Sequence, residues 1–303
     1  IRNLSEYFLS FYLIYVYSTE DHSIDYVSNV FILLAIVMSI LNLTIGQGIN
    51  RITFSENLNV NTIAIVMMFG IGFVLYNLIR DETKLYNWIA GFAAIALFAY
   101  MILITVSKKA ILGAGFLILF WALWCSGKDN TKGRVRKVVI FVLVLAALYY
   151  GYELFVKYMP TQYEYLLIRM GQLSEGTSSN KRRELIVQGF QVFAQNPVFG
   201  VGLNNFRYHT FYNTYSHCFY SELFACLGIC GVLIFFIPFF SGIASMIKRL
   251  TRTNSLIIKN KIKYIMAILV CLMGTSIAQI IFYEYELIYI LGVICASKCI
   301  DNE

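Results

Sequence analysis

The chain has 303 residues, of which 59% are hydrophobic and 14% are charged, and its formal net charge at pH 7 is +7. This composition excludes an ordinary water-soluble domain, because there are too few polar side chains to cover an apolar core of this size. We therefore expect a multi-pass membrane protein whose first partner is the lipid bilayer, and we expect no nucleic acid among its partners.

Apolar runs that are long enough, or nearly long enough, to cross a bilayer recur along the chain, since a helical crossing takes roughly 17–25 residues. Eight such runs occupy residues 28–45, 61–79, 88–105, 110–125, 138–153, 218–243, 264–281 and 284–298. A further run from Tyr7 to Tyr17 is too short to span, and the chain starts at Ile1, so we also expect helices upstream. The pattern predicts an all-α, polytopic transmembrane helical bundle with about eight or nine spans.

Lysine and arginine residues in the short connections predict the orientation, because cytoplasmic connections are enriched in them. Connections 126–137 and 246–263 are both densely basic, so both are expected inside. Two spans separate them, which places the long segment between those spans outside. The same alternation places the acidic stretch 18–27 inside, against the usual charge bias. The expected parts are N-terminal transmembrane helices, one large extracytoplasmic loop with amphipathic helices, and C-terminal transmembrane helices, at residues 1–153, 154–216 and 217–303.

Three helices that we expect on the outer side begin with cations after a residue that can cap a helix. They are Ser107 before Lys108 and Lys109, the stretch 178–180 before Lys181, Arg182 and Arg183, and Ser216 before His217. A helix N-terminus carries a partial positive charge, so a cation there is unfavourable by a few tenths to about 1 kcal/mol. An anion would compensate, and the unpaired N–H groups at such ends bind phosphates. We therefore interpret the outer face as a diphosphate-binding site.

Two simpler interpretations of these cations stay open. Lys108 and Lys109 can be lysines at a helix end that extend their ammonium groups to the membrane surface. Arg182 and Arg183 can lie on the solvated face of an amphipathic helix, with an apolar stripe that lays the helix along the membrane surface. That stripe consists of Leu185, Ile186, Gly189, Phe190 and Phe193.

His217 is the candidate general base. We expect it in the first turn of a transmembrane helix, where the helix dipole and nearby cations disfavour the imidazolium and keep the ring neutral near pH 7. The alternative is an interfacial histidine that only satisfies backbone groups. Glu222 lies one turn further into the membrane, where an ionisable side chain usually faces a cavity, so it is a candidate for binding a sugar. The pair Gly200 and Gly202 is interpreted as a helix-terminating turn.

Several motifs occur in a distinctive order. They are Arg182-x-x-x-Ile186 through Phe193, then Asn196-Pro197-Val198-Phe199-Gly200-Val201-Gly202-Leu203-Asn204-Asn205-Phe206, then His217 and Leu227-Gly228-Ile229-Cys230-Gly231. Over roughly residues 50–245 this order resembles the O-antigen ligase and polysaccharide polymerase family. Ser107-Lys108-Lys109-Ala110 is similar to that family's serine–arginine element with lysine in place of arginine, and Cys218 stands where the family commonly has asparagine.

The resemblance implies a GT-C-like membrane glycosyltransferase that needs no metal and no cofactor. Its donor and acceptor would be oligosaccharides linked to polyprenyl (undecaprenyl) diphosphate, and its product a capsule, an O-antigen or an exopolysaccharide. By the resemblance, Arg182 with Arg183 would hold the donor diphosphate, Lys108 would assist, and His217 would activate the acceptor hydroxyl. The other candidate substrate-binding residues are Ser107, Lys109, Asn204, Arg207 and Glu222. The active site would lie on the extracytoplasmic face of the cytoplasmic membrane, with a flippase and a chain-length regulator as further partners.

Our first expectation is a polysaccharide repeat-unit polymerase. The closest alternative is a ligase that moves finished glycan onto a lipid or surface acceptor, and the residues do not separate the two because both reactions share donor, leaving group and base. A different class is a membrane transporter of an anionic solute. That class would require ionisable residues near the middle of the membrane and interrupted helices in two matching halves.

Overall fold

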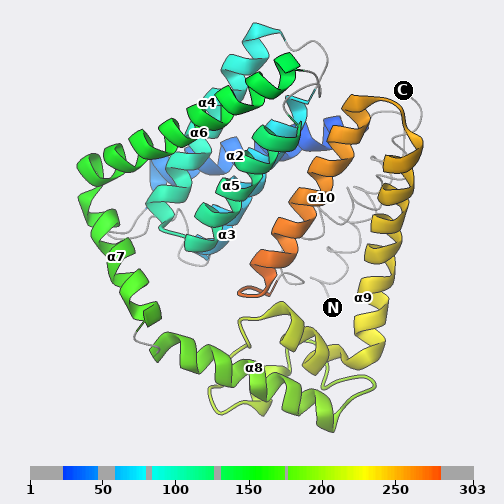
Figure 1. Ribbon diagram of the computed structural model, residues 1–303. Helices are drawn as coiled ribbons and strands as arrows, with labels where there is room; N and C mark the ends of the chain where they lie inside the picture. The colour runs from blue at the N-terminus through cyan, green and yellow to red at the C-terminus, as the bar shows by residue number, and fades with distance from the viewer. Residues whose placement is uncertain (1–22, 47–58, 80–83, 126–130, 175–176, 281–303) are drawn as a thin grey trace. The chain divides into compact units, whose positions relative to one another are not determined.

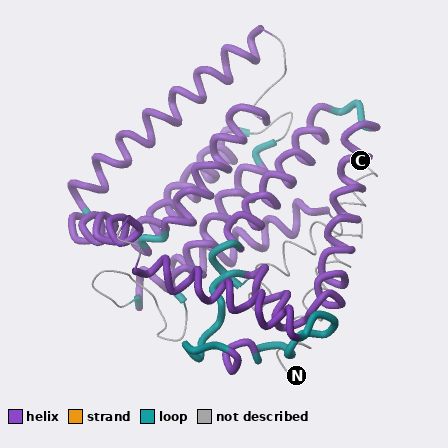
Figure 2. Tube along the Cα trace, turned by 60° about the horizontal axis from the view of Figure 1, so that its bottom comes forward, coloured by secondary structure: helices purple, strands orange, loops and turns teal. Residues whose placement is uncertain are grey.

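The computed structural model describes residues 23–46, 59–79, 84–125, 131–174 and 177–280 (Figure 1). Within these ranges the chain consists of helices and connecting coil, with no strand, as the tube in Figure 2 shows. The helices are α2 (Ser23–Ile45), α3 (Val60–Asn77), α4 (Leu85–Thr105), α5 (Lys108–Phe120) continued by the π-helix η1 (Trp121–Cys125), α6 (Thr131–Tyr158), α7 (Pro160–Ser174), α8 (Thr177–Gln195), the 3-10 helix η2 (Phe206–His209), α9 (Phe219–Arg252) and α10 (Leu256–Ser276).

The expected all-α membrane architecture is confirmed. Among the described residues, five helical segments are long and apolar enough to cross a bilayer: Val27–Ile45, Val60–Asn77, Leu85–Thr105, Lys108–Cys125 and Phe219–Arg252. These agree with five of the eight apolar runs in the sequence. The expected run 284–298 lies outside the described residues, as does the short run near Ile1. The expected total of eight or nine spans therefore stays a prediction.

The chain forms two compact units. The first, which we call the helical unit, consists of residues 25–168 and 248–271. The second, which we call the loop unit, consists of residues 169–247 with the described residues of 1–24 and 272–303. The helical unit contains α3 to α6 with most of α2 and α10. The loop unit contains α8, η2 and most of α9.

The helical unit is built around α3. In the apolar stretch of α3 that could cross a membrane, 83% of the residues are buried, compared with 28–39% in the corresponding stretches of α2, α4 and α5. Small residues allow the neighbours to approach closely, as is usual between membrane helices. A Cβ atom added at Gly72 would lie 3.2 Å from Leu117 of α5 and 3.5 Å from Ile268 of α10. At Gly70 the nearest atom, 2.9 Å away, belongs to Phe98 of α4. Helix α3 is therefore the inner helix of this unit.

Polar contacts join one end of α2, α3 and α10. Lys261 of α10 forms a salt bridge with Asp25 of α2 at 2.9 Å, and its ammonium lies 5.2 Å from the centre of the Tyr76 ring. On the next turn of α2, the Ser28 hydroxyl donates to Asn77 Oδ1 at 2.7 Å. Asp25 belongs to the acidic stretch that the charge rule disfavours inside, and Lys261 belongs to the basic connection 246–263. Their ion pair gives a physical reason for an acidic residue at that end of the helical unit.

Two helix starts differ from the sequence expectation. Helix α8 begins at Thr177 and not near Lys181, because no glycine or proline between them stops the helix, so Arg182 and Arg183 lie in its second turn. Helix α9 begins at Phe219 and not at His217, because His217 has a left-handed backbone with φ of 57° that no helix can include. Neither the arginines nor the histidine therefore belong to a first helical turn.

Coil 196–218, which contains η2, docks onto a break in α9. The break is at Gly228, where φ is 60° and ψ is −163°. In an unbroken helix, the N–H groups of Ile229 and Cys230 would donate to the carbonyls four residues earlier. Here they donate to Pro197 O (2.9 Å) and Val198 O (3.1 Å) of the coil. The two carbonyls on the other side of the break accept from the coil at 3.0 and 2.8 Å, in the bonds Val201 N to Ala225 O and Gly202 N to Cys226 O.

Two glycines make this contact possible. A Cβ atom added at Gly228 would lie 2.5 Å from Val198 O, and one added at Gly200 would lie 2.4 Å from the carbonyl carbon of Cys226. Both glycines also have positive φ, 60° and 67°, which side chains of L-residues disfavour. The turn expected at Gly200 is present, and it is also one half of a backbone-to-backbone contact between distant segments.

A Gly228→Ala variant tests this docking. We expect it to cost about 2 kcal/mol or more through left-handed strain and the clash with Val198, which lowers Tm by roughly 4–8 °C in a chain of this size. Trypsin cleavage after Arg207 in the coil should accelerate at the same time. The matched control is Gly115→Ala in α5, where an added Cβ meets no atom within 4 Å. Equal Tm values and equal cleavage rates in the two variants would show that the coil does not depend on the break.

Candidate functional site

Helix α8 packs its apolar stripe against α9 and η2. Leu185 and Val192 are buried together with Phe206 of η2 and with two small residues of α9, Ala225 and Cys226. Gly189 lies opposite Ser221 of α9. A Cβ atom added at Gly189 would lie 3.0 Å from the Ser221 Cβ. The stripe expected to lie on the membrane surface therefore makes the core of the loop unit, although Phe190 is still 46% exposed.

Arg182 and Arg183 are exposed on α8, beside a contact that fastens the coil to this helix. The Tyr212 hydroxyl donates a hydrogen bond to the Glu184 carboxylate, and the Lys181 ammonium lies 4.6 Å from the centre of the Tyr212 ring. That hydrogen bond raises the pKa of the Tyr212 phenol, because deprotonation would place two negative charges together. Figures 1 and 2 both show the coil folded beside α8. Sequence reasoning missed Tyr212, since a lone tyrosine in a coil carries no local signal.

His217 lies at the end of the coil, two residues before α9 begins. Its left-handed backbone costs about 1–2 kcal/mol, and its ring centre lies 4.2 Å from that of Tyr215. The preceding amide is held firmly, because Ser216 N donates to Glu222 Oε2 at 2.7 Å. The Ser216 hydroxyl donates to Cys218 O at 2.8 Å in the same turn. Strained residues held by their surroundings are frequent at active sites.

Glu222 differs from its expected surroundings. The sequence suggests a carboxylate that faces a cavity and binds a sugar. In the structure Glu222 is only 1% exposed, and its carboxylate accepts a hydrogen bond from the Ser216 amide. An acidic side chain in the first turn of a helix commonly satisfies N–H groups just before that helix. This signal was present in the sequence, and it makes Glu222 a residue that positions the His217 turn.

Arg207 and Asn204 contact each other within the coil. Arg207 Nε donates to Asn204 O at 3.2 Å, and the guanidinium also donates to the Asn204 side-chain oxygen. Asn204 has a left-handed backbone with φ of 62°, a conformation that asparagine tolerates better than most residues. Both candidate substrate-binding residues are therefore arranged around η2, on the coil that also carries His217.

Ser107, Lys108 and Lys109 lie in the helical unit, at the start of α5. Helix α5 begins at Lys108 with Ser107 as its N-cap residue, as expected, but the serine hydroxyl makes no capping bond. Ser107 is 1% exposed, and its Oγ has no hydrogen-bond partner among the described residues. Lys108 and Lys109 are half-buried. A buried hydroxyl at a helix N-terminus, next to two ammonium groups, is chemically suited to an anionic oxygen.

The residues singled out from the sequence therefore fall into two sets. Arg182, Arg183, Asn204, Arg207 and His217 lie in the loop unit, on α8 or on the coil that packs against it. Ser107, Lys108 and Lys109 lie in the helical unit. The first set contains cations and an imidazole, residue types that suit stabilisation of a leaving anion and removal of a proton.

Comparison with known proteins agrees with this chemistry. The family model described as O-antigen ligase matches residues 92–236, a region that runs from α4 into α9 and contains every candidate site residue. It also contains the whole contact between coil 196–218 and the break at Gly228. A search among curated proteins finds no match. With its apolar spans and this matched region, the chain is an integral membrane protein in which residues 92–236 match the model of the O-antigen ligase family.

Proposed function

We propose that this protein polymerises oligosaccharide repeat units by moving a growing glycan from polyprenyl diphosphate onto a sugar hydroxyl of the next lipid-linked unit. The match to the O-antigen ligase family model supports glycosyl transfer at a membrane in general. The observation that carries the proposed transfer chemistry is the strained His217, which is held by the Glu222 clamp on the neighbouring amide.

The proposed transfer needs one base and one anion site. The acceptor oxygen attacks the anomeric carbon of the donor sugar, its proton passes to the His217 imidazole, and the bond from that carbon to the diphosphate oxygen breaks. The diphosphate then leaves with the electron pair. Arg182 and Arg183 stabilise its negative charge, and Lys108 with the buried Ser107 hydroxyl assists. No metal is required in this scheme, because the cations supply the charge.

The second candidate function is a ligase that transfers finished glycan to a lipid or surface acceptor. It is favoured by the description of the matching family, which is O-antigen ligase. The two functions differ in product and not in chemistry, because donor, leaving group and base are common to both. We further propose that the active site lies on the outer face of the cytoplasmic membrane.

Product length separates the two functions. The purified protein in lipid vesicles is given one lipid-linked repeat unit and no other acceptor. A polymerase produces a ladder of oligosaccharides on polyprenyl diphosphate, which gel electrophoresis and mass spectrometry resolve. A ligase produces no ladder until a separate acceptor lipid is added, and that result would reject polymerisation.

Removal of the imidazole tests the base. We expect His217→Ala to lower the transfer rate at saturating donor by about 100-fold or more, since positioned general bases contribute roughly 10²–10⁴-fold. His209→Ala is the matched control, because His209 is exposed on η2 in the same coil. It should retain the wild-type rate within about twofold. Equal rates in the two variants, with unchanged Tm, would exclude His217 as the base.

Charge changes test the diphosphate site. Arg182→Ala should raise KM for the lipid-linked donor about tenfold or more, because hydrogen bonds to charged groups are each worth roughly 1.5–3 kcal/mol. Lys108→Arg should lower KM, since an arginine forms two parallel bonds to a phosphate where a lysine forms a point contact. Lys248→Ala in the basic connection 246–263 is the control and should leave KM unchanged. An unchanged KM in Arg182→Ala would remove this residue from the site.

A further inference from the structure

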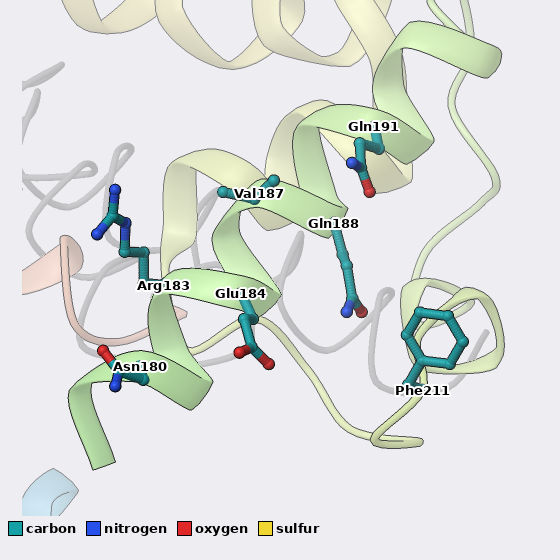
Figure 3. Close-up of a pocket in the computed structure, with 7 residues that line it drawn as sticks. All are labelled: Asn180, Arg183, Glu184, Val187, Gln188, Gln191 and Phe211. Carbon is teal, nitrogen blue, oxygen red and sulfur yellow. The ribbon is translucent and has the colours of Figure 1, made fainter. Parts of the chain in front are cut away.

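Helix α8 has a pocket on the face opposite its buried stripe. The pocket has a volume of about 430 Å³ and is lined by side chains of α8, among them Asn180, Arg183, Gln188 and Gln191, with Phe211 of the coil on the other side (Figure 3). With Glu184 and Val187, which also line the pocket, these helix positions recur at spacings of three and four residues, so they share one face. Helix α8 therefore buries one face in the loop unit and uses another to line a pocket.

The far wall of the pocket is an exposed aromatic ring. Phe211 is 92% exposed, and it is adjacent in sequence to Tyr212, whose hydroxyl donates to Glu184 on α8. That hydrogen bond and the contact of Lys181 with the Tyr212 ring hold the neighbouring stretch of coil next to the helix. An exposed ring costs free energy in water, and its electron-rich face accepts weak C–H contacts of the kind that the apolar face of a sugar ring offers.

One hydrogen-bond acceptor on the polar side of the pocket lacks a donor. Gln188 Oε1 is buried, and none of the described residues donates to it. A buried acceptor without a partner costs roughly 1–3 kcal/mol. A sugar hydroxyl can donate to this oxygen, whereas a fully ionised phosphate has only acceptors to offer. The Glu184 carboxylate also lines the pocket and repels an anion.

We propose that this pocket binds sugar rings of the lipid-linked glycan, with Phe211 against the ring face and Gln188 accepting from a ring hydroxyl. This inference rests on the proposed function, in which the substrate is such a glycan. The pocket runs from Arg183, the neighbour of Arg182, to Gln191, a length of about 12 Å along the helix axis. The sugar attached to the diphosphate lies at the Arg183 end, and the next sugar of the chain lies towards Gln191.

Binding without turnover tests this inference on the full chain in lipid nanodiscs. The probes are the lipid-free repeat-unit oligosaccharide of the source strain, titrated by saturation-transfer difference NMR, and, separately, inorganic pyrophosphate, titrated by the line broadening of its ³¹P signal. Gln188→Leu and Phe211→Ala should each weaken oligosaccharide binding about tenfold and leave pyrophosphate binding within twofold. The controls are Gln195→Leu at the end of α8 and Phe199→Ala, an exposed ring of the same coil outside the pocket. Both should bind the oligosaccharide like the wild type.

The outcomes distinguish this inference from the proposed function. A wild-type protein that makes polymer but binds the oligosaccharide no more tightly than Gln188→Leu and Phe211→Ala overturns the sugar pocket. Equal weakening of pyrophosphate and oligosaccharide in Gln188→Leu overturns it as well, because the pocket would then be a phosphate site. A wild-type protein that binds the oligosaccharide through Gln188 and Phe211, yet makes no polymer, supports the pocket and contradicts the proposed polymerisation.

Discussion

The loop unit depends on one exchange of backbone hydrogen bonds. At Gly228 the ladder of α9 opens, and coil 196–218 supplies two donors and two acceptors to the groups on either side of the opening. Unsatisfied backbone groups within a membrane cost several kcal/mol each, so a break in a spanning helix requires partners of this kind. Gly200 and Gly228 permit the contact because any side chain at either position would overlap with the opposite backbone.

The same coil is fastened at three places, and each fastening positions a candidate functional group. Its start is held on the break in α9, its middle is held by Tyr212 on Glu184, and its end is held by Ser216 on Glu222. Phe211 at the pocket wall directly precedes the second place, and His217 directly follows the third. A coil held in this way can keep a strained histidine in place without belonging to a helix. The protein's own coil fills the break in α9. This filling distinguishes the break from the open interrupted helices that a transporter would use.

Much of the fold could be predicted from local sequence, and less of the site. The apolar runs gave five spanning helices with ends close to those observed, and Lys108 was correctly placed at the start of α5. The starts of α8 and α9 were wrong by two to four residues, since capping preferences of serine and threonine do not identify which of several candidates begins a helix. The surroundings of Glu222 also differ from the expected cavity, because its carboxylate accepts a hydrogen bond from a backbone amide.

The sequence by itself determined the class of this protein: an apolar composition excludes a soluble core, and spans, basic connections and motif order indicate a membrane protein that resembles the O-antigen ligase family. Those properties depend on residue type and spacing along one segment. Only the tertiary structure decided that the glycines of two motifs touch each other, that the apolar face of α8 packs against protein, that Tyr212 contacts Glu184 and that Gln188 lines a pocket. Each of these is a contact between segments that are distant in sequence, or a cavity beside such a contact. No local pattern encodes them, because the chain fold alone determines which distant atoms become neighbours.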